Sequence, residues 1–212
     1  MLTGLLKPTR GSVEIGGHDI QRDPEHAKAL MSYVPDFPFL YDKLTPHEFM
    51  RFVGEIYRLD RPTISQRTGA LFEKFHLNDY AYELTENLSH GTRQRLVIAA
   101  ALLHEPKVFV IDEPMVGLDP QHARIVKSEF KERARGGMTL FLSTHQLSVA
   151  EEVADRVGII HRGRLIALGT VDELRQKSRQ EGALEKVFLA LVDAEDAANP
   201  NDDQQRPPLE EP

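Results

Sequence analysis

The spacing of hydrophobic residues predicts helices in the first half of the chain and a buried strand near its centre. From Pro46 to about His76, apolar residues recur three and four positions apart, which predicts helix. A further helix is expected from about Gly91 to Leu103. The run KVFVIDE (107–113) has the length of a strand and is mostly apolar up to its final carboxylates, as in a strand buried on both faces of a parallel sheet.

Shorter strands and helices are expected on either side of these segments. Near the N-terminus, MLTGLL looks like the end of an apolar helix, SVEIGGHDI alternates as a strand with a Gly-Gly turn, and MSYVP (31–35) is a short strand. The second half should contain, in order, a helix from about Gln121 to Arg135, the strand MTLFLS (138–143), a short helix at 147–154, the strand pair RVGIIHRGRLIALG with a turn at Arg162-Gly163, and two final helices.

This order of elements predicts an α/β fold with a parallel sheet and a separate helical lobe. The last twenty residues are acidic, proline-rich and poor in large apolar side chains, so they are expected to be disordered. The expected parts are a first portion of the core at 1–43, a helical subdomain at 44–100, the rest of the core at 101–177, a C-terminal helix at 178–192 and a disordered acidic tail at 193–212.

Composition is that of a soluble globular protein and narrows the range of functions. Of 212 residues, 41% are hydrophobic and 28% charged, and no stretch reaches the roughly 18 apolar residues of a membrane span. The chain has no cysteine, which excludes disulfides and thiolate metal sites and favours a reducing compartment. A formal net charge of -7 argues against a general nucleic-acid binder. We therefore expect a cytoplasmic protein with no nucleic-acid partner.

Candidate chemistry lies where two predicted strands end. Asp112 and Glu113 close the apolar strand, at the end where parallel sheets place ligands, and adjacent side chains on a strand point to opposite faces. One division of roles gives Asp112 to a Mg²⁺ ion and leaves Glu113 to polarise a water molecule. His145 follows the next strand and would lie on the same rim, within reach of a phosphate or that water. The alternatives are a helix N-cap or solvated turn for the carboxylates and a structural role for the histidine.

Four segments in order are similar to motifs of the ABC-type ATPases. VFVIDEPMVGLDP resembles their Walker B strand, catalytic glutamate and D-loop, and LSHGTRQRL (88–96) resembles their LSGGQ signature. STHQ (143–146) resembles the switch-histidine loop, and YVPDFPFLYDKLTPHEF (33–49) stands in the place of the Q-loop and the start of the helical lobe. The resemblance covers about residues 1 to 177 and implies a P-loop NTPase-like core with a helical subdomain. The residues within these motifs resemble those of ATPases of ABC-2-type exporters.

The resemblance implies that ATP and Mg²⁺ are the cofactors and assigns roles at the ends of the strands. Asp112 would hold the water shell of Mg²⁺, and Glu113 would be the general base for attack on the γ-phosphate. His145 would contact the γ-phosphate and organise the attacking water. Asp36 stands where the family usually has the Q-loop glutamine, and it could reach the metal through water.

The resemblance also implies a site shared between two subunits. Ser89 and Gly91, at the start of the signature helix, would bind the γ-phosphate of ATP held by the opposite subunit, and Asp119 would lie at the interface of a head-to-tail dimer. A hydroxyl and a small residue before a helix N-terminus independently favour anion binding, although Ser89 could be a plain N-cap. His90 and Thr92 replace the Gly and Gln that the family usually has, and a histidine near phosphate could assist binding.

A phosphate-binding loop is the feature that the resemblance leads one to expect and that the chain does not show. No G-x-x-x-x-G-K-[ST] string occurs in the sequence, and Met1 falls a few residues beyond the place of its lysine in the family. The sequence is therefore expected to be an ABC ATPase without the first strands and the P-loop. Such a chain should bind little ATP at its own site, while its signature segment could still serve a full-length partner.

Three functions follow as hypotheses. The first is the ATP-hydrolysing subunit of a membrane exporter, on the inner face of the cell membrane, with transmembrane permease subunits and a second ATPase subunit as partners. Phe37, Phe39, Leu40 and Tyr41 could dock the permease or could pack on their own core. The second is an ABC ATPase of DNA repair, chromosome structure or translation. The third is a catalytically deficient half-site or regulatory subunit.

Overall fold

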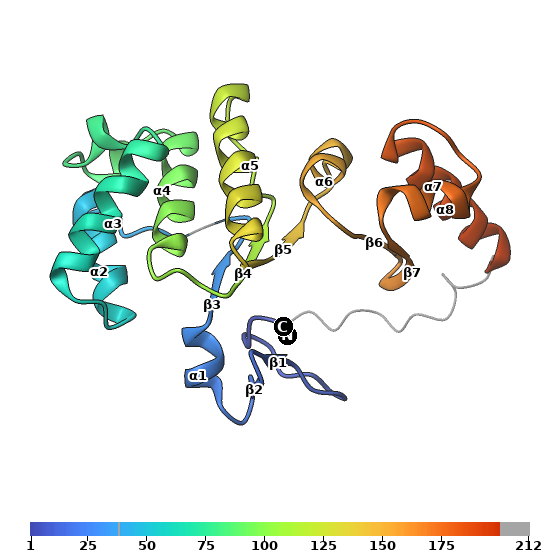
Figure 1. Cartoon of the computed structure of the whole chain (residues 1–212), viewed down its shortest axis with the longest axis horizontal. Coiled ribbons are helices and arrows are strands. Elements are labelled where there is room, and N and C mark those ends of the chain that lie inside the picture. The colour runs from blue at the N-terminus through green and yellow to red at the C-terminus, as the bar shows by residue number, and fades with distance from the viewer. Residues whose placement is uncertain (38, 200–212) are drawn as a thin grey trace. The chain divides into compact units, whose positions relative to one another are not determined.

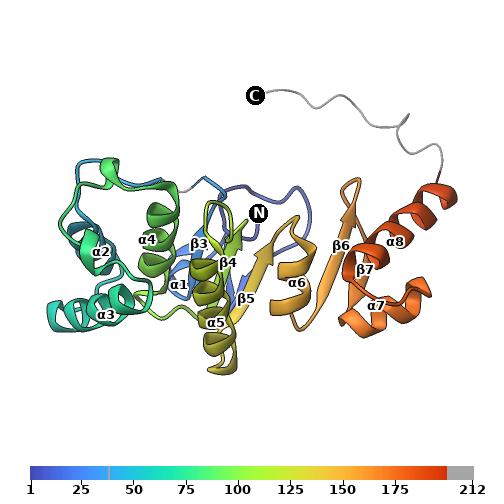
Figure 2. The same cartoon turned by 90° about the horizontal axis from the view of Figure 1, so that it is seen from above.

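The computed structural model describes residues 1–37 and 39–199, and the chain divides into two compact units, residues 1–144 and 145–212 (Figures 1 and 2). The first unit contains a parallel sheet with helices, and the second contains an antiparallel strand pair with three helices. Residue 38 and residues 200–212, which form most of the tail expected to be disordered, lie outside the described residues. Each unit is considered separately below.

The sheet of the first unit is parallel, as predicted, and has the order β3-β4-β5. Its strands are β3 (Met31–Val34), β4 (Val108–Asp112) and β5 (Thr139–Ser143). The central strand β4 buries Phe109, Val110 and Ile111, which explains its continuous apolar run. In register, Val34 pairs with Ile111, and Asp112 pairs with Ser143, so the three carboxyl ends lie at one edge of the sheet.

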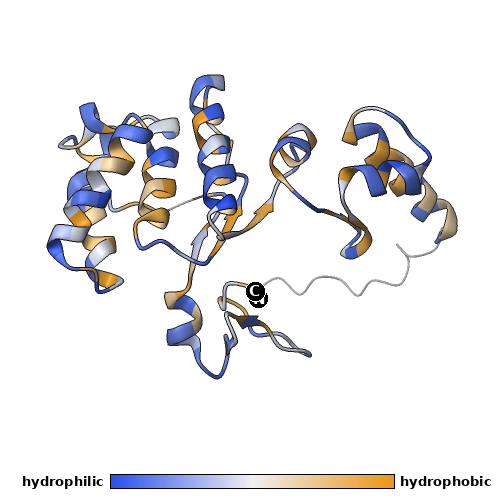
Figure 3. Cartoon of the chain, viewed as in Figure 1, coloured by the Kyte–Doolittle hydropathy of each residue, from blue (hydrophilic) through white to orange (hydrophobic). Residues whose placement is uncertain are grey.

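Helices α4 (His90–Leu102) and α5 (Pro120–Arg135) lie beside this sheet. Both views place α4 beside β3 and α5 beside β5. The hydroxyl of Ser32 on β3 donates a hydrogen bond to the carbonyl of Ala101 on α4 at 2.5 Å, and Phe109 meets Phe130 of α5 edge-on, with ring centroids 5.7 Å apart. Figure 3 shows β4 and β5 as mainly hydrophobic, whereas α5 carries long hydrophilic stretches.

The helical segment predicted from Pro46 to His76 is two helices, α2 (Pro46–Ile56) and α3 (Arg61–Lys74). The break has a local cause. Arg58 adopts a left-handed φ of 58°, and the side chain of Asp60 accepts a hydrogen bond from the N–H of Thr63, which starts a new helix with Pro62 in its first turn. Two short 3-10 turns, η1 (Asn78–Tyr80) and η2 (Thr85–Asn87), lead from α3 toward α4.

The N-terminal segment differs from the prediction at its start. Residues 1–6 form turns and bends and no helix, because Gly4 has a φ of 72° and donates its N–H to the carbonyl of Met1 at 3.0 Å. The predicted strand with a Gly-Gly turn is the antiparallel pair β1 (Glu14–Ile15) and β2 (His18–Asp19). A helix that the hydrophobic pattern did not predict, α1 (Pro24–Ala29), follows this hairpin.

The second unit packs two strands against helices. The strands β6 (Val157–His161) and β7 (Arg164–Gly169) are antiparallel, with the predicted turn at Arg162 and Gly163, both at positive φ. Its helices are α6 (Leu147–Val153), α7 (Val171–Ser178) and α8 (Leu184–Ala198), and its core consists of Val157, Ile159, Ala167, Leu174, Leu184, Val187 and Leu191. Because α8 continues to Ala198, the expectation of disorder from residue 193 is wrong for residues 193–198.

A half-buried histidine joins the end of α4 to the start of β3. The ring of His104 stacks on that of Tyr57, with centroids 3.5 Å apart and planes 8° from parallel, and its Nε2 lies 3.5 Å from the Ser32 hydroxyl. Burial lowers the pKa of His104 to about 4, since a charged imidazolium would lose its hydration there. The folded chain therefore holds this histidine neutral at physiological pH.

This burial predicts a loss of stability in mild acid. Between about pH 6.5 and about pH 4 the unfolded chain binds a proton at His104 that the folded chain does not, so the free energy of unfolding falls as the pH falls. The slope should approach about 1.4 kcal/mol per pH unit, with a total of about 3 kcal/mol at most. Urea unfolding at several pH values, on the wild type and on His104→Gln, measures this contribution as the difference between the two slopes. Equal slopes would contradict it.

Candidate functional site

The N-terminus of α4 presents free hydrogen-bond donors beside a hydroxyl. Ser89 caps the helix, since its Oγ accepts the N–H of Thr92 at 3.2 Å and lies 2.9 Å from Thr92 Oγ1. The first bond along the helix runs from the N–H of Arg93 to the carbonyl of Ser89, at 2.9 Å. The N–H groups of His90 and Gly91 therefore have no acceptor within the helix, as is usual in a first turn. Such a turn can bind an anion.

A buried arginine lies one turn further along α4. Arg95 is 5% exposed, and its Nη1 donates to the carbonyls of Phe75 and His76 at 2.6 and 2.9 Å. Its Nε donates to the carbonyl of Gly91 at 3.3 Å, and its Nη2 donates to Thr92 Oγ1 at 3.1 Å. Within the described residues, each of these acceptors is neutral. Burial lowers the pKa of Arg95, but a guanidinium stays charged at physiological pH, so a positive charge lies just behind the helix N-terminus.

The loop after β4 brings a carboxylate to the same place. Asp119 caps α5, with Oδ1 accepting the N–H of His122 at 3.0 Å and Oδ2 lying 2.6 Å from His122 Nδ1. The backbone hydrogen bond from His122, followed by the bond from its ring, lowers the pKa of Asp119, so this carboxylate is ionised at neutral pH. Asp119 is exposed, and its orientation is set by His122.

Two glycines allow the loop and the helix to touch. A Cβ on Gly91 would lie 2.6 Å from the carbonyl oxygen of Gly117, and a Cβ on Gly117 would lie 2.0 Å from Nδ1 of His90. Gly117 also has a φ of 75°, which other residues rarely adopt. The amide of Gln94, which is buried, reaches the carbonyl of Pro114 at 3.5 Å and adds a second link. Packing against backbone therefore excludes a side chain at Gly91, and the positive φ disfavours one at Gly117.

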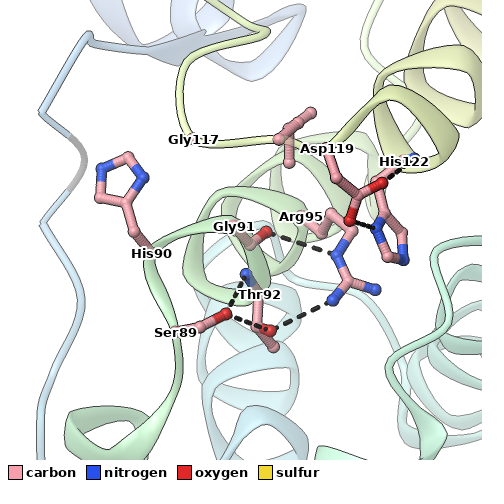
Figure 4. A pocket seen from close by; sticks show the side chains of 9 residues that line it. Ser89, His90, Gly91, Thr92, Arg95, Gly117, Asp119 and His122 are labelled. Carbon is pink, nitrogen blue, oxygen red and sulfur yellow. Dashed lines mark hydrogen bonds and ion pairs between the residues drawn. The ribbon is translucent and has the colours of Figure 1, made fainter.

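These elements enclose a cavity of about 310 Å³ (Figure 4). Its lining consists of Ser89, His90, Gly91, Thr92, Arg95, Gly117, Leu118, Asp119 and His122. The structure thus brings together four residues predicted from the sequence, namely Ser89, His90, Gly91 and Asp119. In Figure 4 the ring of His90 is directed away from the side where Arg95 lies.

Sequence reasoning missed part of this lining. Arg95 and His122 were not singled out, and Thr92 was noted only as a departure from the family pattern. The signals were present but weak. Arg95 stands directly before the apolar run of α4, which begins at Leu96. The spacing of Asp119 and His122 across a helix start, with Pro120 between them, indicates their pairing.

Three other predicted residues, Asp36, Asp112 and Glu113, lie at the carboxyl edge of the sheet of the first unit and do not line this cavity. Glu113 is half-buried and has a left-handed φ of 45°, a strained conformation for glutamate. Its N–H donates to the carbonyl of Ser143 at 2.9 Å, and its Oε2 accepts from the hydroxyl of Thr144 at 3.0 Å. Asp112 ends β4 beside it, and Asp36 follows β3 at the same edge. His145 is the first residue of the second unit, and its predicted role stays a prediction.

Comparison with known proteins gives a consistent result. A family model described as "ABC transporter" matches residues 1–116. The ABC-type transporter ATP-binding protein EcsA of Bacillus subtilis is 33% identical over 199 residues, which are 93% of this chain and 80% of EcsA. The linearmycin resistance ATP-binding protein LnrL of the same bacterium is 34% identical over 174 residues, which are 82% of this chain and 56% of LnrL.

A solved structure of an ATP-binding subunit of an ABC transporter has the same fold. It matches with a TM-score of 0.85 at 32% sequence identity and covers 90% of this chain and 80% of that chain. The predicted ABC ATPase core is therefore confirmed, and members of this family hydrolyse ATP. The chain belongs to the ABC transporter family and is one of its ATP-binding subunits.

Proposed function

We propose that this subunit hydrolyses ATP in a head-to-tail dimer and thereby powers export through transmembrane permease subunits. The observation that carries the proposal is the cavity at the N-terminus of α4. It combines unpaired helix N–H groups, the hydroxyl of Ser89 and the buried charge of Arg95, a combination that favours a phosphate. Its lining does not include Glu113, the candidate base, so the proposal assigns phosphate binding and proton abstraction to two separate sites of the subunit.

A second subunit would bring a phosphate-binding site and a candidate base together, because each subunit would contribute one of them to a shared ATP site. In a head-to-tail pair, Ser89 and the N–H groups of His90 and Gly91 bind the γ-phosphate of ATP held mainly by the partner. Asp119 lies on the loop that lines the same cavity and so faces the same partner. The cation at Arg95 favours closure when the triphosphate is present, because its charge is only weakly screened in a buried position.

The edge of the sheet supplies the hydrolytic groups in this proposal. Glu113 accepts a proton from a water molecule as the water oxygen bonds to the γ-phosphorus, and the bond between that phosphorus and the bridging oxygen of ADP breaks. The hydroxyl of Thr144 donates a hydrogen bond to Oε2 of Glu113 and so helps to orient the carboxylate that would accept the proton. Asp112 would hold Mg²⁺, which neutralises charge on the phosphates, and Asp36 would reach the same ion through water. His145 would contact the γ-phosphate.

An exposed aromatic patch is proposed as the permease contact. Phe37 and Phe39 are 85% and 78% exposed, and Tyr41 packs edge-on against both Phe39 and Phe52, at centroid distances of 5.4 and 5.3 Å. Leu40, the fourth apolar residue of this stretch, is buried and belongs to the core. Contiguous exposed apolar side chains of this kind commonly mark a protein–protein contact.

The proposed location is the cytoplasmic face of the cell membrane, reached through the permease. No described helix is both long enough and apolar enough to span a bilayer. Export is the proposed direction, since the relative LnrL is named for resistance to linearmycin.

Replacing the candidate base tests the hydrolytic role. Glu113→Gln is expected to lower ATP turnover by at least about 100-fold, because an amide cannot accept the proton from water. The substitution itself should not alter ATP binding, because it leaves the proposed phosphate-binding groups of Ser89, His90 and Gly91 unchanged. The ATPase rate is measured on the subunit expressed from its own gene and purified with its membrane partner. Glu73→Gln, on the exposed surface of α3, is the matched control and should keep wild-type turnover. Turnover within twofold of wild type in Glu113→Gln would contradict the assignment.

Two substitutions of Ser89 separate phosphate binding from helix capping. Ser89→Ala removes both the cap and the phosphate contact, so it should lose about 1 kcal/mol of stability together with activity. Ser89→Asp keeps a good capping oxygen but places a negative charge where the γ-phosphate binds. Its stability should stay near that of the wild type, while ATP turnover falls further than in Ser89→Ala.

The matched control places the same change at another helix. Thr170 caps α7 through the N–H of Glu173, so Thr170→Asp should change neither stability nor turnover appreciably. If Ser89 is only a cap, Ser89→Asp will keep wild-type turnover and Ser89→Ala alone will be impaired. Thermal unfolding and ATPase rates of the three variants, in the same complex, distinguish the two cases.

A further inference from the structure

Two histidines and an aspartate meet on the N-terminal hairpin, away from the cavity of α4. His18 Nδ1 lies 2.7 Å from Asp23 Oδ2, and His26 Nδ1 lies 2.6 Å from Asp23 Oδ1. The two imidazole rings are stacked, with centroids 5.2 Å apart and planes 19° from parallel. One candidate ligand atom from each of the three side chains lies within 4.8 Å of the others. Within the described part of the chain, no other group of three such side chains has this geometry.

The backbone places the three side chains together. Gly16 and Gly17, both at positive φ, form the two-residue turn that pairs Ile15 with His18. The carboxylate of Asp19 then accepts the N–H groups of Gln21 and Arg22, and the carbonyl of Asp19 accepts the N–H of Asp23 at 2.8 Å. This turn carries the chain back, so that Asp23 and His26 lie beside β2.

The chain contains an internal comparison for this cluster. The string Asp-Pro-x-His occurs at residues 23–26 and again at 119–122, both times at the start of a helix. In the second copy, Asp119 caps the helix through the N–H of His122. In the first copy, Asp23 makes no capping bond, and each of its oxygens faces one imidazole. The first carboxylate is thus directed toward two ring nitrogens instead of the backbone.

We infer that His18, Asp23 and His26 form a binding site for a borderline divalent cation of the Zn²⁺ type. Two imidazoles and one carboxylate are ligands that Zn²⁺, Co²⁺ and Ni²⁺ share, whereas Mg²⁺ and Ca²⁺ prefer oxygen alone. Three protein ligands leave a further position for water. The cation would join β2 to α1, and it is separate from the Mg²⁺ that the family uses with ATP.

The geometry requires only a small adjustment. Donor atoms around a tetrahedral Zn²⁺ lie about 3.4 Å apart, given bonds of about 2.0 to 2.1 Å. The rings now contact different oxygens of Asp23, at 2.7 and 2.6 Å, and the three ligand atoms lie within 4.8 Å of one another, so each distance must change by about 1.5 Å or less. His26 has 70% of its side chain exposed and His18 has 38%, so both rings can move without disturbing a core.

Titration of the tag-free, chelator-treated full chain with Zn²⁺ by calorimetry tests the inference. We expect one Zn²⁺ per chain, and Co²⁺ should give the intense visible absorption of a tetrahedral site. His18→Gln and His26→Gln should each weaken binding at least tenfold, because loss of even an outer-shell partner commonly costs about that much. His122→Gln is the matched control, since it alters the second Asp-Pro-x-His string, and it should leave the affinity unchanged.

Three results would overturn the inference. They are no binding at Zn²⁺ concentrations up to about 100 μM, equal binding in all variants, and loss of binding in His122→Gln alone. Circular dichroism in the presence of chelator shows whether each variant is folded. If a histidine variant does not fold, Asp23→Asn, which keeps shape and removes charge, serves in its place and should show the same weakening.

Discussion

The contact between Gly91 and Gly117 is the constraint on which the candidate site depends. At this point the carbonyl of a loop meets the first turn of a helix so closely that a Cβ at Gly91 would lie 2.6 Å from it. The contact fixes where Asp119 stands relative to Ser89, although thirty residues of chain separate them. A side chain at Gly91 would push the loop away and open the cavity, whereas one at Gly117 would strain the backbone and displace the ring of His90. The pocket is therefore defined by backbone packing, and its polar groups act within that frame.

Arg95 contributes a positive charge to the lining of this cavity. Burying a guanidinium is costly unless its donors are satisfied, and here three backbone carbonyls and the hydroxyl of Thr92 accept from it. Neutral acceptors satisfy its hydrogen bonds but leave its charge, which the ionised carboxylate of Asp119 in the same lining attracts, as would any anion that enters the cavity. Thr92, which departs from the usual family residue, has a structural part in this network, because its hydroxyl links Ser89 to Arg95. An anion at the helix N-terminus would complete the balance of charge.

The sequence predicted the parallel sheet and the segments around Ser89 and Asp119 because these depend on local pattern. The strand of residues 107–113 and the turn at Arg162-Gly163 are each determined by residues that are adjacent in the sequence. It did not reveal the break between α2 and α3, because the apolar spacing continues across it while Asp60 and Pro62 begin a new helix. It also did not reveal the role of Arg95, whose acceptors on residues 75 and 76 come from another helix end. Contacts between segments that are distant in the sequence do not produce a periodic pattern of hydrophobic residues, so such a pattern cannot predict them.

The two Asp-Pro-x-His strings show why identical local sequence can serve different chemistry. At Asp119, one carboxylate oxygen accepts the backbone N–H of His122, so only the other oxygen contacts an imidazole ring. At Asp23 both oxygens are available, and a second histidine arrives from β2, which the hairpin turn of Gly16 and Gly17 brings alongside. The difference lies in the neighbouring strand and not in the string itself. Such a site can be recognised only from the fold, because the fold of residues 14–29 is what brings His18 beside Asp23 and His26.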